Sequence, residues 1–412
     1  MNYLFYLLPT FLLFGCGIGD HMNDDNMDST VTTTSTHNFL YYGDITNDMV
    51  VKLDVTLIKP ISSTDSNGLY PYEIAKALNN KLYVLNRHDN IIGVLDPITN
   101  SIIDEVALEF YPRSISINNN NTLLTSSNRP SAVTIIDNIA SNTYSDSTYK
   151  SPLSYGGTKA TGHPIWVDSN HFLLLDRTEN TIELYKKGIY RPIDKLKTKS
   201  SVHHIIVRNG ILYGISEGKQ NGISPGIIKF TILDNKINII KERLLSSFSN
   251  LPLDFKSDVW GVHHGAFHPT LDYIYIGSTE GNVFVLDIKN LELVDTFRAS
   301  TGVGHFTFYK NMIITTNHYS NIKTFHNISN PRDNKYITSL KFGDIIYDAI
   351  TMQSHTTHII GNNLYFMFNT DTDSILYEVN LDSITITRKI TLSNHYCLMG
   401  SLVSDTVTTN GM

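Results

Sequence analysis

The sequence predicts an all-β fold, and three observations support this prediction. Tyr and Phe are plentiful, at 23 and 18 of 412 residues, and polar turns rich in Asn, Ser and Asp separate short apolar runs. This mixture favours strands over long helices. The strand-like runs recur with a period of about 40 residues, which is typical of the four-stranded blades of a β-propeller. We therefore expect a single propeller of seven or eight four-stranded blades, with eight slightly favoured.

The clearest repeat shows what each unit contains. Residues 81–86 (KLYVLN), 90–96 (NIIGVLD) and 101–106 (SIIDEV) are three apolar runs separated by short polar turns. An inner strand that begins near Pro71 completes the unit. The other full repeats begin near Pro112, His163, His203, His263, His305 and His358.

The two ends of the chain are predicted to close the propeller together. Three strand-like runs within residues 39–59 form a further repeat that lacks its first strand. We expect residues 395–399 (HYCLM) to supply that strand, because such a closure removes free sheet edges that invite aggregation. The propeller is then expected to span residues 39–403, with a flexible tail at residues 404–412.

The N-terminal residues have the character of an export signal. Residues 3–14 are apolar apart from Pro9 and Thr10, a run too short to cross a bilayer as a helix and typical of a secretory signal. The run ends at Cys16 in the sequence Leu-Phe-Gly-Cys, which resembles the cleavage box of bacterial lipoproteins. An ordinary cleaved signal and a short anchor are the alternatives, and each places the mature protein outside the cytoplasm.

The lipoprotein interpretation predicts the domain limits and the location. We expect a signal peptide at residues 1–15, a lipid on Cys16, and a disordered polar tether at residues 16–38. The protein would lie in the periplasm or at the cell surface, held to a bacterial membrane by the lipid anchor alone. Cys397 is the only other cysteine, so with a lipid on Cys16 we expect no disulfide framework. The alternative is a bridge between Cys16 and Cys397.

The charge pattern argues against nucleic acid as a partner. The formal net charge is -7 at pH 7, and no basic stripe occurs that could neutralise phosphates. The glycine-rich pieces lack a following helix, and no Gly-x-Ser-x-Gly elbow occurs, so phosphate-loop and lipase-type functions are not indicated.

A histidine recurs at the start of the predicted innermost strand in successive repeats. These histidines are His163, His204, His264, His305 and, with a one-residue slip, His358. Innermost strands line the central channel of a propeller, so residues at equivalent positions converge on one axis. Imidazoles are good ligands for Zn²⁺ and also for Cu²⁺, and three or four suffice for a tetrahedral site. The pattern therefore predicts a metal site, zinc before copper, at the channel rim.

Four further histidines are expected to orient these ligands. In two repeats a second histidine precedes the predicted ligand, and two others follow second strands near the same rim: His203, His263, His88 and His318. Because adjacent strand residues face opposite ways, one member of each histidine pair should face the channel and the other the blade. The alternative is a polar channel in which the histidines bond only to backbone groups and to each other.

Three of these motifs resemble those of a known family. Residues 202–205 (VHHI), 262–266 (VHHGA) and 162–168 (GHPIWVD) are similar to the histidine motifs of periplasmic zinc metallochaperones that serve an ABC-type zinc importer, the AztD family. Residues 82–96 also resemble the broader YVTN-type propellers. The resemblance implies a propeller that binds zinc and passes it to the solute-binding protein of a metal importer. The chain departs from that family in lacking a His-rich flexible loop and a cysteine after the His264 segment.

Three classes of function are compatible with this pattern. The first is an extracytoplasmic, non-enzymatic propeller that chaperones or stores zinc. The second is a propeller enzyme of lactonase or copper type, which needs an open metal position beside an acid or base, and no such group is obvious in the sequence. The third is a scaffold that presents the propeller to another protein. Metal content separates the first two classes from the third, and turnover separates the second from the first.

Overall fold

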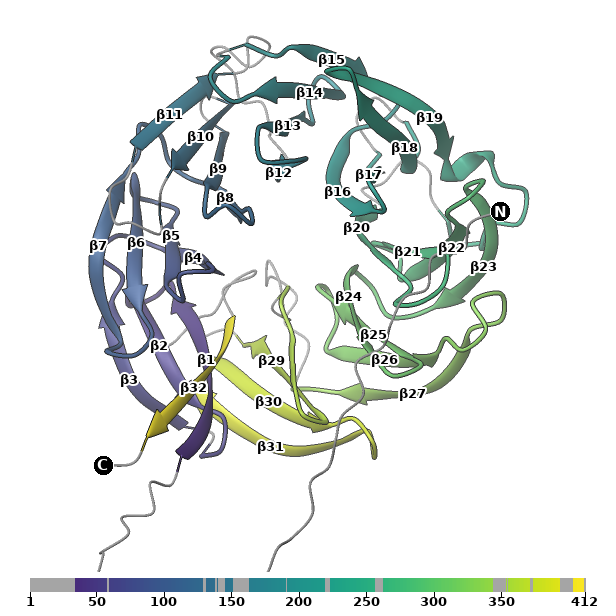
Figure 1. The fold of residues 1–412 in the computed structure, drawn as a ribbon. Helices are drawn as coiled ribbons and strands as arrows, with labels where there is room; N and C mark the ends of the chain where they lie inside the picture. Colours follow the sequence, from purple (N-terminus) through teal and green to yellow (C-terminus); the bar gives the residue numbers. More distant parts are fainter. Residues whose placement is uncertain are drawn as a thin grey trace, which may run out of the picture. The chain divides into compact units, whose positions relative to one another are not determined.

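In the computed structural model, the described residues form eight four-stranded antiparallel sheets and one short 3-10 helix. The structure describes residues 34–410 except 58, 129–130, 138, 140–144, 151–162, 190, 219–222, 256–261, 344–352, 354, 371–372 and 393–402. The chain divides into a large compact unit, Thr36–Val407, and a smaller one, of which the structure describes Thr34, Ser35 and Thr408–Asn410. Within the larger unit the sheets follow one another around a ring as propeller blades (Figure 1), which confirms the predicted fold with eight blades.

Neighbouring strands within each blade are antiparallel, and most of them are consecutive in the chain. The first four blades contain β1 (Thr34–Asp44), β2 (Met49–Asp54), β3 (Lys59–Asp65) and β32 (Val403–Asn410); β4 (Pro71–Lys76), β5 (Leu82–Asn86), β6 (Ile91–Asp96) and β7 (Ser101–Ala107); β8 (Ser114–Ile117), β9 (Leu123–Asn128), β10 (Ser131–Asp137) and β11 (Ser145–Lys150); and β12 (Ile165–Trp166), β13 (His171–Asp176), β14 (Thr181–Lys186) and β15 (Asp194–Lys197).

The other four blades repeat this order. They contain β16 (Val202–Arg208), β17 (Ile211–Ser216), β18 (Gly226–Leu233) and β19 (Lys236–Leu244), followed by the 3-10 helix η3 (Leu245–Ser247); β20 (Val262–Phe267), β21 (Tyr273–Ser278), β22 (Asn282–Asp287) and β23 (Glu292–Arg298); β24 (Val303–Tyr309), β25 (Met312–Asn317), β26 (Ile322–Asn327) and β27 (Lys335–Lys341); and β28 (His358–Ile360), β29 (Asn363–Asn369), β30 (Ser374–Asn380) and β31 (Thr385–Leu392).

The first blade takes strands from both ends of the chain. Its order is β3-β2-β1-β32, so β32 holds the place that β4 or β16 holds in another blade (Figure 1). The expected closure by an N-terminal and a C-terminal strand is confirmed. The closing strand β32 begins at Val403 and includes residues that were expected to form a flexible tail. Residues 395–399, predicted for this role, lie outside the described residues.

A tyrosine on the second strand of a blade joins that blade to the next. The hydroxyl groups of Tyr41, Tyr83 and Tyr213 donate hydrogen bonds to backbone carbonyls that follow the third strand of the next blade. The acceptors are the carbonyls of Pro97 at 3.0 Å, Ile139 at 2.9 Å and Ile288 at 3.5 Å. Each phenol ring is buried, so the hydrogen bond satisfies a group that would otherwise lose water at a cost.

The last blade packs directly on the first. Leu40 and Tyr42 of β1 belong to the same apolar cluster as Tyr365 and Met367 of β29. Arg388 of β31 adds a polar link, because its guanidinium donates to the Thr56 carbonyl at 2.8 Å and to the Val55 carbonyl at 3.3 Å. Apolar burial and backbone hydrogen bonds therefore hold the ring shut where the chain ends meet.

The predicted export signal, Cys16, the tether before Thr34, and Cys397 all lie outside the described residues. In the part of the chain that the structure describes, no helix has the length and apolar character needed to cross a membrane.

Candidate metal centre

A β-bulge at the start of the innermost strand sets the direction of the rim side chains. The pairing register shifts between Pro71 and Glu73, between Val202 and His204, between Val262 and Gly265, and between Val303 and His305. Such a bulge adds a residue to one strand and re-aims the side chains around it. The bulged segment of β16 is the one that carries the His203-His204 pair.

Three of the predicted ligands share one register position. His204 and His305 each pair with the penultimate residue of the neighbouring strand. Glu73 occupies the same position in the second blade, opposite Leu85. Because Ile165 pairs with Leu173, His163 falls opposite Leu175, which is again penultimate. The histidine register inferred from the sequence therefore corresponds to a real structural position.

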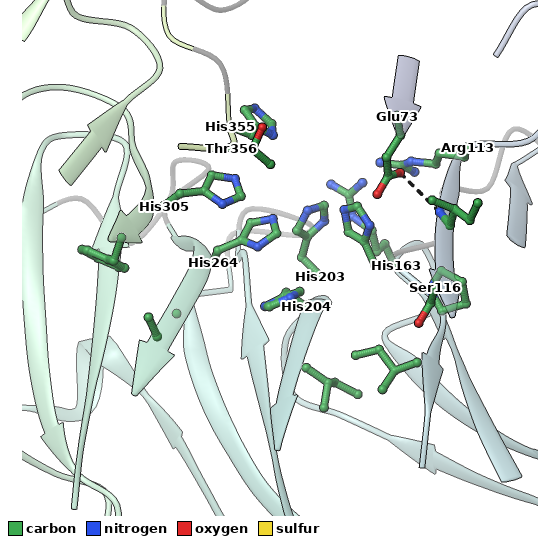
Figure 2. A pocket seen from close by; sticks show the side chains of 18 of the residues that line it. Glu73, Arg113, Ser116, His163, His203, His204, His264, His305, His355 and Thr356 are labelled. Atoms are coloured by element: carbon green, nitrogen blue, oxygen red, sulfur yellow. Dashed lines mark hydrogen bonds between the residues drawn. The ribbon is translucent and has the colours of Figure 1, made fainter. Parts of the chain in front are cut away.

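These positions line one cavity of about 740 Å³. Figure 2 shows that His163, His203, His204, His264, His305 and His355 gather along it, with Glu73 and Arg113 beside His163. The histidines come from the fourth to the eighth blade, so the propeller symmetry brings together residues that lie nearly 200 positions apart in the chain.

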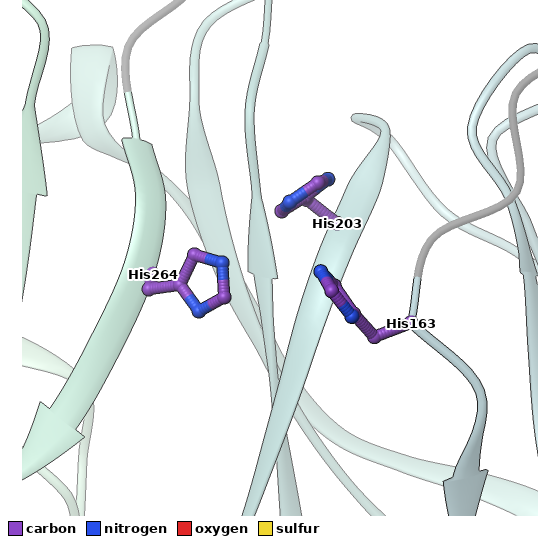
Figure 3. Close-up of side chains that lie close together, drawn as sticks. All are labelled: His163, His203 and His264. Carbon is purple, nitrogen blue, oxygen red and sulfur yellow. The ribbon is translucent and has the colours of Figure 1, made fainter. Parts of the chain in front are cut away.

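The side chains of His163, His203 and His264 lie close enough together to hold a metal ion (Figure 3). One ring nitrogen of each lies within 4.8 Å of the others. A zinc ion with Zn–N distances of ~2.1 Å separates its ligand atoms by about 3.4 Å. Small side-chain movements would therefore bring the three imidazoles onto one ion. The donor set fits zinc, because neutral nitrogen ligands are those it prefers beside thiolates.

The buried carboxylate of Glu217 lies next to the imidazole of His203. His203 Nδ1 lies 3.2 Å from Oε1 of Glu217, and each side chain is 2% exposed. Arg177 Nε donates to the other carboxylate oxygen of Glu217 at 3.0 Å. A carboxylate on one imidazole nitrogen fixes the tautomer and the ring orientation of a histidine ligand, and it makes the other nitrogen a better donor to a metal.

His305, His318 and His355 form a second group of the same kind. Their ligand nitrogens also lie within 4.8 Å of one another, and the His318 and His355 ring centroids are 4.0 Å apart. Gly304 makes this packing possible, since a Cβ atom there would lie 1.9 Å from His318 Nε2. The His264 and His305 centroids are 4.1 Å apart, so the two groups adjoin.

The structure distributes the other predicted site residues around these groups. His204 lines the cavity, with its ring centroid 4.2 Å from that of His264. Both members of the His203-His204 pair therefore face the cavity, unlike the expected alternation, because the bulge interrupts the strand pleat. His88 stacks on Tyr70 at 4.2 Å, outside both groups.

The eighth blade departs from the predicted pattern. His358 pairs with Tyr365, whereas Gln353 bridges to Phe368, the penultimate residue of β29. Gln353 therefore holds the shared register position, and His358 lies farther along the strand. His355, which was not singled out in the sequence, contributes to the second group instead. The side chain of His263 lies outside the described residues.

The end of the cavity near His163 carries groups of a different kind. Glu73 accepts a hydrogen bond from the Ile115 backbone N–H at 3.3 Å, and burial raises the pKa of its carboxyl group to about 8. Burial, followed by the positive charges of Arg177 and Arg87, lowers the pKa of Arg113 to about 10. At neutral pH this end therefore presents a guanidinium cation and a carboxyl group that is largely protonated.

The fold of this chain is similar to that of a solved propeller, AztD. AztD from Citrobacter koseri, in its apo form, superposes with a TM-score of 0.62 at 9% identity, and the match covers 92% of this chain and 100% of AztD. The chain has the fold of AztD. The sequence itself matches no protein-family model and no curated protein. The likeness to AztD that the histidine motifs suggested is therefore confirmed at the level of the fold.

Other propellers share this architecture at similar identity. The dihydro-heme d1 dehydrogenase NirN, in complex with DHE, gives a TM-score of 0.64 at 10% identity and covers 87% of this chain and 74% of its own. BamB from Moraxella catarrhalis gives 0.54 at 12% identity, with 78% and 88% covered. At such identities, likeness to AztD, NirN and BamB shows the fold, and the function of this chain has to be argued from its own cavity.

Proposed function

We propose that this protein is an extracytoplasmic zinc-binding propeller that chaperones or stores the ion. The observation that carries the proposal is the group His163, His203 and His264, whose ligand nitrogens lie within 4.8 Å of one another. The resemblance in fold to AztD, a periplasmic zinc metallochaperone in the family resemblance stated above, supports the same interpretation.

The chemistry of the cavity suits an ion that is held and then released. Three imidazoles leave at least one coordination position for water or for a ligand from an acceptor protein. Because the cavity, at about 740 Å³, has room for further ligands beside the ion, an incoming donor can reach the ion before the last histidine leaves. Imidazoles bind metal only when deprotonated, so zinc binding should weaken as the pH falls below the ordinary imidazole pKa of about 6.5.

The second group gives the ion a further binding position. His305, His318 and His355 offer three more imidazoles, and His264 and His305 bring the two groups within one ring contact. We propose that two zinc ions bind per chain when zinc is abundant. His204 would then adjust the ligand set or remain in the cavity wall. His358 is not among the residues that line the cavity.

The partner and location follow from the chain's other features. We propose that the export signal ending at Cys16 carries the protein to the periplasm or cell surface, with a lipid on Cys16 as the membrane anchor. A solute-binding protein of a metal ABC importer is the proposed acceptor of the zinc. Mass spectrometry of the mature N-terminus tests the anchor, since an intact Met1 or an unacylated N-terminus beyond Cys16 would contradict it.

Zinc transfer tests the function directly. Full-length protein without a histidine tag is purified and loaded with zinc, and an apo solute-binding protein serves as the acceptor. In one arrangement the two proteins share a chamber. In the other, a dialysis membrane that passes zinc but not protein separates them, and the rate of zinc transfer is measured in both. Faster transfer when the proteins share a chamber supports a chaperone. Equal rates in both arrangements support storage, and absence of bound zinc after loading contradicts both.

An enzyme is the second candidate, favoured by one observation. Glu73 places a carboxyl group in the same cavity as the histidines, which is the acid or base that a metal-dependent enzyme needs beside an open metal position. Turnover of lactones by the zinc-loaded or copper-loaded protein, lost in Glu73→Gln, would favour this candidate. If the protein binds no metal and turns over no substrate, the scaffold role is the remaining candidate.

A further inference from the structure

The cavity is much larger than a zinc ion requires. Its volume of about 740 Å³ compares with ~30 Å³ for one water molecule in the liquid, and it lies in the range typical of pockets for small organic ligands. The histidines line only part of it. Glu73, Arg113 and Ser116 line the part beyond His163 (Figure 2), and Tyr72 also lines the cavity.

The charges around the cavity favour an anion beside the metal. Imidazole ligands are neutral, so three of them leave the zinc ion its full double positive charge. Arg113 faces the same cavity, and Arg87 and Arg177 are close enough to act on its charge. The buried carboxylate of Glu217 accepts from Arg177 and lies beside His203, and its charge also acts on Arg113. Cations that share a partly desolvated space repel one another unless an anion lies between them.

We propose that the cavity binds zinc together with a small carboxylate chelator, as one complex held between the histidine group His163, His203 and His264 and the guanidinium of Arg113. This inference rests on the proposed zinc-binding function. It specifies that function further, because the cargo is a zinc carboxylate complex and not the bare ion.

Simple coordination chemistry is consistent with such a complex. A tridentate aminodicarboxylate fills three of the six positions of an octahedral zinc ion and leaves three positions, the number of imidazoles in the group. A carboxylate bound to zinc through one oxygen keeps its second oxygen as an acceptor. A guanidinium is the side chain best suited to donate to that oxygen, since the hydrogen bond is charge-assisted and directional.

Two chelators of equal denticity test the proposal. Iminodiacetate carries two carboxylates, and diethylenetriamine carries none. The full-length apo protein is dialysed at pH 7.5 against the 1:1 zinc complex of each, and bound zinc and bound chelator are both quantified. We expect equimolar retention of zinc and iminodiacetate, with an apparent Kd at least tenfold lower than for the diethylenetriamine complex. Free zinc is titrated in parallel as the test of the proposed function.

Variants of Arg113 identify the group responsible. Arg113→Met should remove the preference for iminodiacetate, and Arg113→Lys should keep most of it because the charge remains. Arg332→Met is the matched control, since it removes a guanidinium whose side chain is 60% exposed and pairs with Asp287 on the surface. This control should keep the full preference.

The outcomes separate this inference from the function on which it rests. If the wild-type protein binds free zinc but excludes iminodiacetate, or retains both chelates equally, the carboxylate complex is wrong and zinc binding stands. A preference that survives in Arg113→Met also overturns the inference. If free zinc does not bind at all, the proposed function itself is wrong.

Discussion

His203 and Glu217 form a buried pair, with Nδ1 of the imidazole 3.2 Å from Oε1 of the carboxylate. The two residues lie 14 positions apart, on β16 and directly after β17 of the same blade. Because the carboxylate lies beside Nδ1, we infer that Nε2 of His203 is the nitrogen that would bind a metal. Arg177 of the preceding blade holds the carboxylate in place from its other oxygen.

Glu217→Gln should therefore weaken zinc binding without removing a ligand. We expect an increase in Kd of about 10- to 100-fold, the usual effect of losing a carboxylate that orients a histidine ligand. Competition with a fluorescent zinc chelator measures it. Glu183→Gln is the control, since Glu183 is another buried carboxylate, paired with Lys195 at 3.0 Å. Equal Kd values for both variants would show that Glu217 does not act through His203.

Gly304→Ala should disrupt the second histidine group selectively. The added Cβ atom would meet His318 Nε2 at 1.9 Å, so the imidazole has to move away. We expect the zinc stoichiometry at saturation to fall from two ions per chain to one, measured by elemental analysis after dialysis. His318→Ala should give the same loss by removing the ligand. Two ions per chain in either variant would contradict the assignment of this group.

Arg388→Met should loosen the ring where the chain ends meet. The change removes hydrogen bonds to the Thr56 and Val55 carbonyls and leaves the buried carboxylate of Glu378 without its guanidinium partner. We expect the free energy of unfolding to fall by about 1–3 kcal/mol, measured by urea denaturation. Lys389→Met, one residue along the same strand, is the control and should change it by less than ~0.5 kcal/mol.

His326 should make the fold sensitive to acid. Burial lowers the pKa of this imidazole to about 4, whereas an unfolded chain has the ordinary value of about 6.5. Between these values the unfolded chain binds a proton that the folded chain does not, so the free energy of unfolding falls as the pH drops from 6.5 to 4. At pH 5 the loss should be about 2 kcal/mol.

His326→Leu should remove that sensitivity. The imidazole lies against the rings of Phe297 and Tyr336, at centroid distances of 4.3 and 5.5 Å, which an aliphatic side chain can also contact. Thermal unfolding of both proteins at pH 7.5 and pH 5 measures the difference. If acid lowers the melting temperature of the variant as much as that of the parent, His326 is not the group responsible.

The fold was largely predictable because each propeller blade repeats the same pattern of strands and turns in the sequence. Strands and turns recur at about 40-residue intervals, and the seven predicted repeat starts fall at or within three residues of the innermost strands, from β4 at Pro71 to β28 at His358. The closing strand was harder to place. Residues 403–410 (VSDTVTTN) include three Thr and only two apolar residues. Their strand lies beside β1, and the backbone groups that pair two strands are the same in any sequence.

The site was only partly predictable, because bulges and loops set its details. The shared register of His163, His204 and His305 follows from spacing, but the bulge that brings His203 into the cavity with His204 leaves no clear mark in the sequence. Glu217 was missed because it directly follows a strand at the start of a long insertion. His355 was missed because it precedes the short strand β28 and lies outside the repeat pattern.

The measurement that tests the central claim most directly is zinc affinity in a variant that lacks the first histidine group. Untagged apo protein is titrated with zinc against a fluorescent chelator, and the parent is compared with His163→Ala/His203→Ala/His264→Ala. His88→Ala/His171→Ala, at histidines outside both groups, is the control. We predict that the parent and the control bind zinc equally well and that the triple variant binds it at least ~1000-fold more weakly at its tightest site, a loss of about 4 kcal/mol. Zinc binding by the triple variant as tight as that of the parent, or no binding by the parent, would contradict the account.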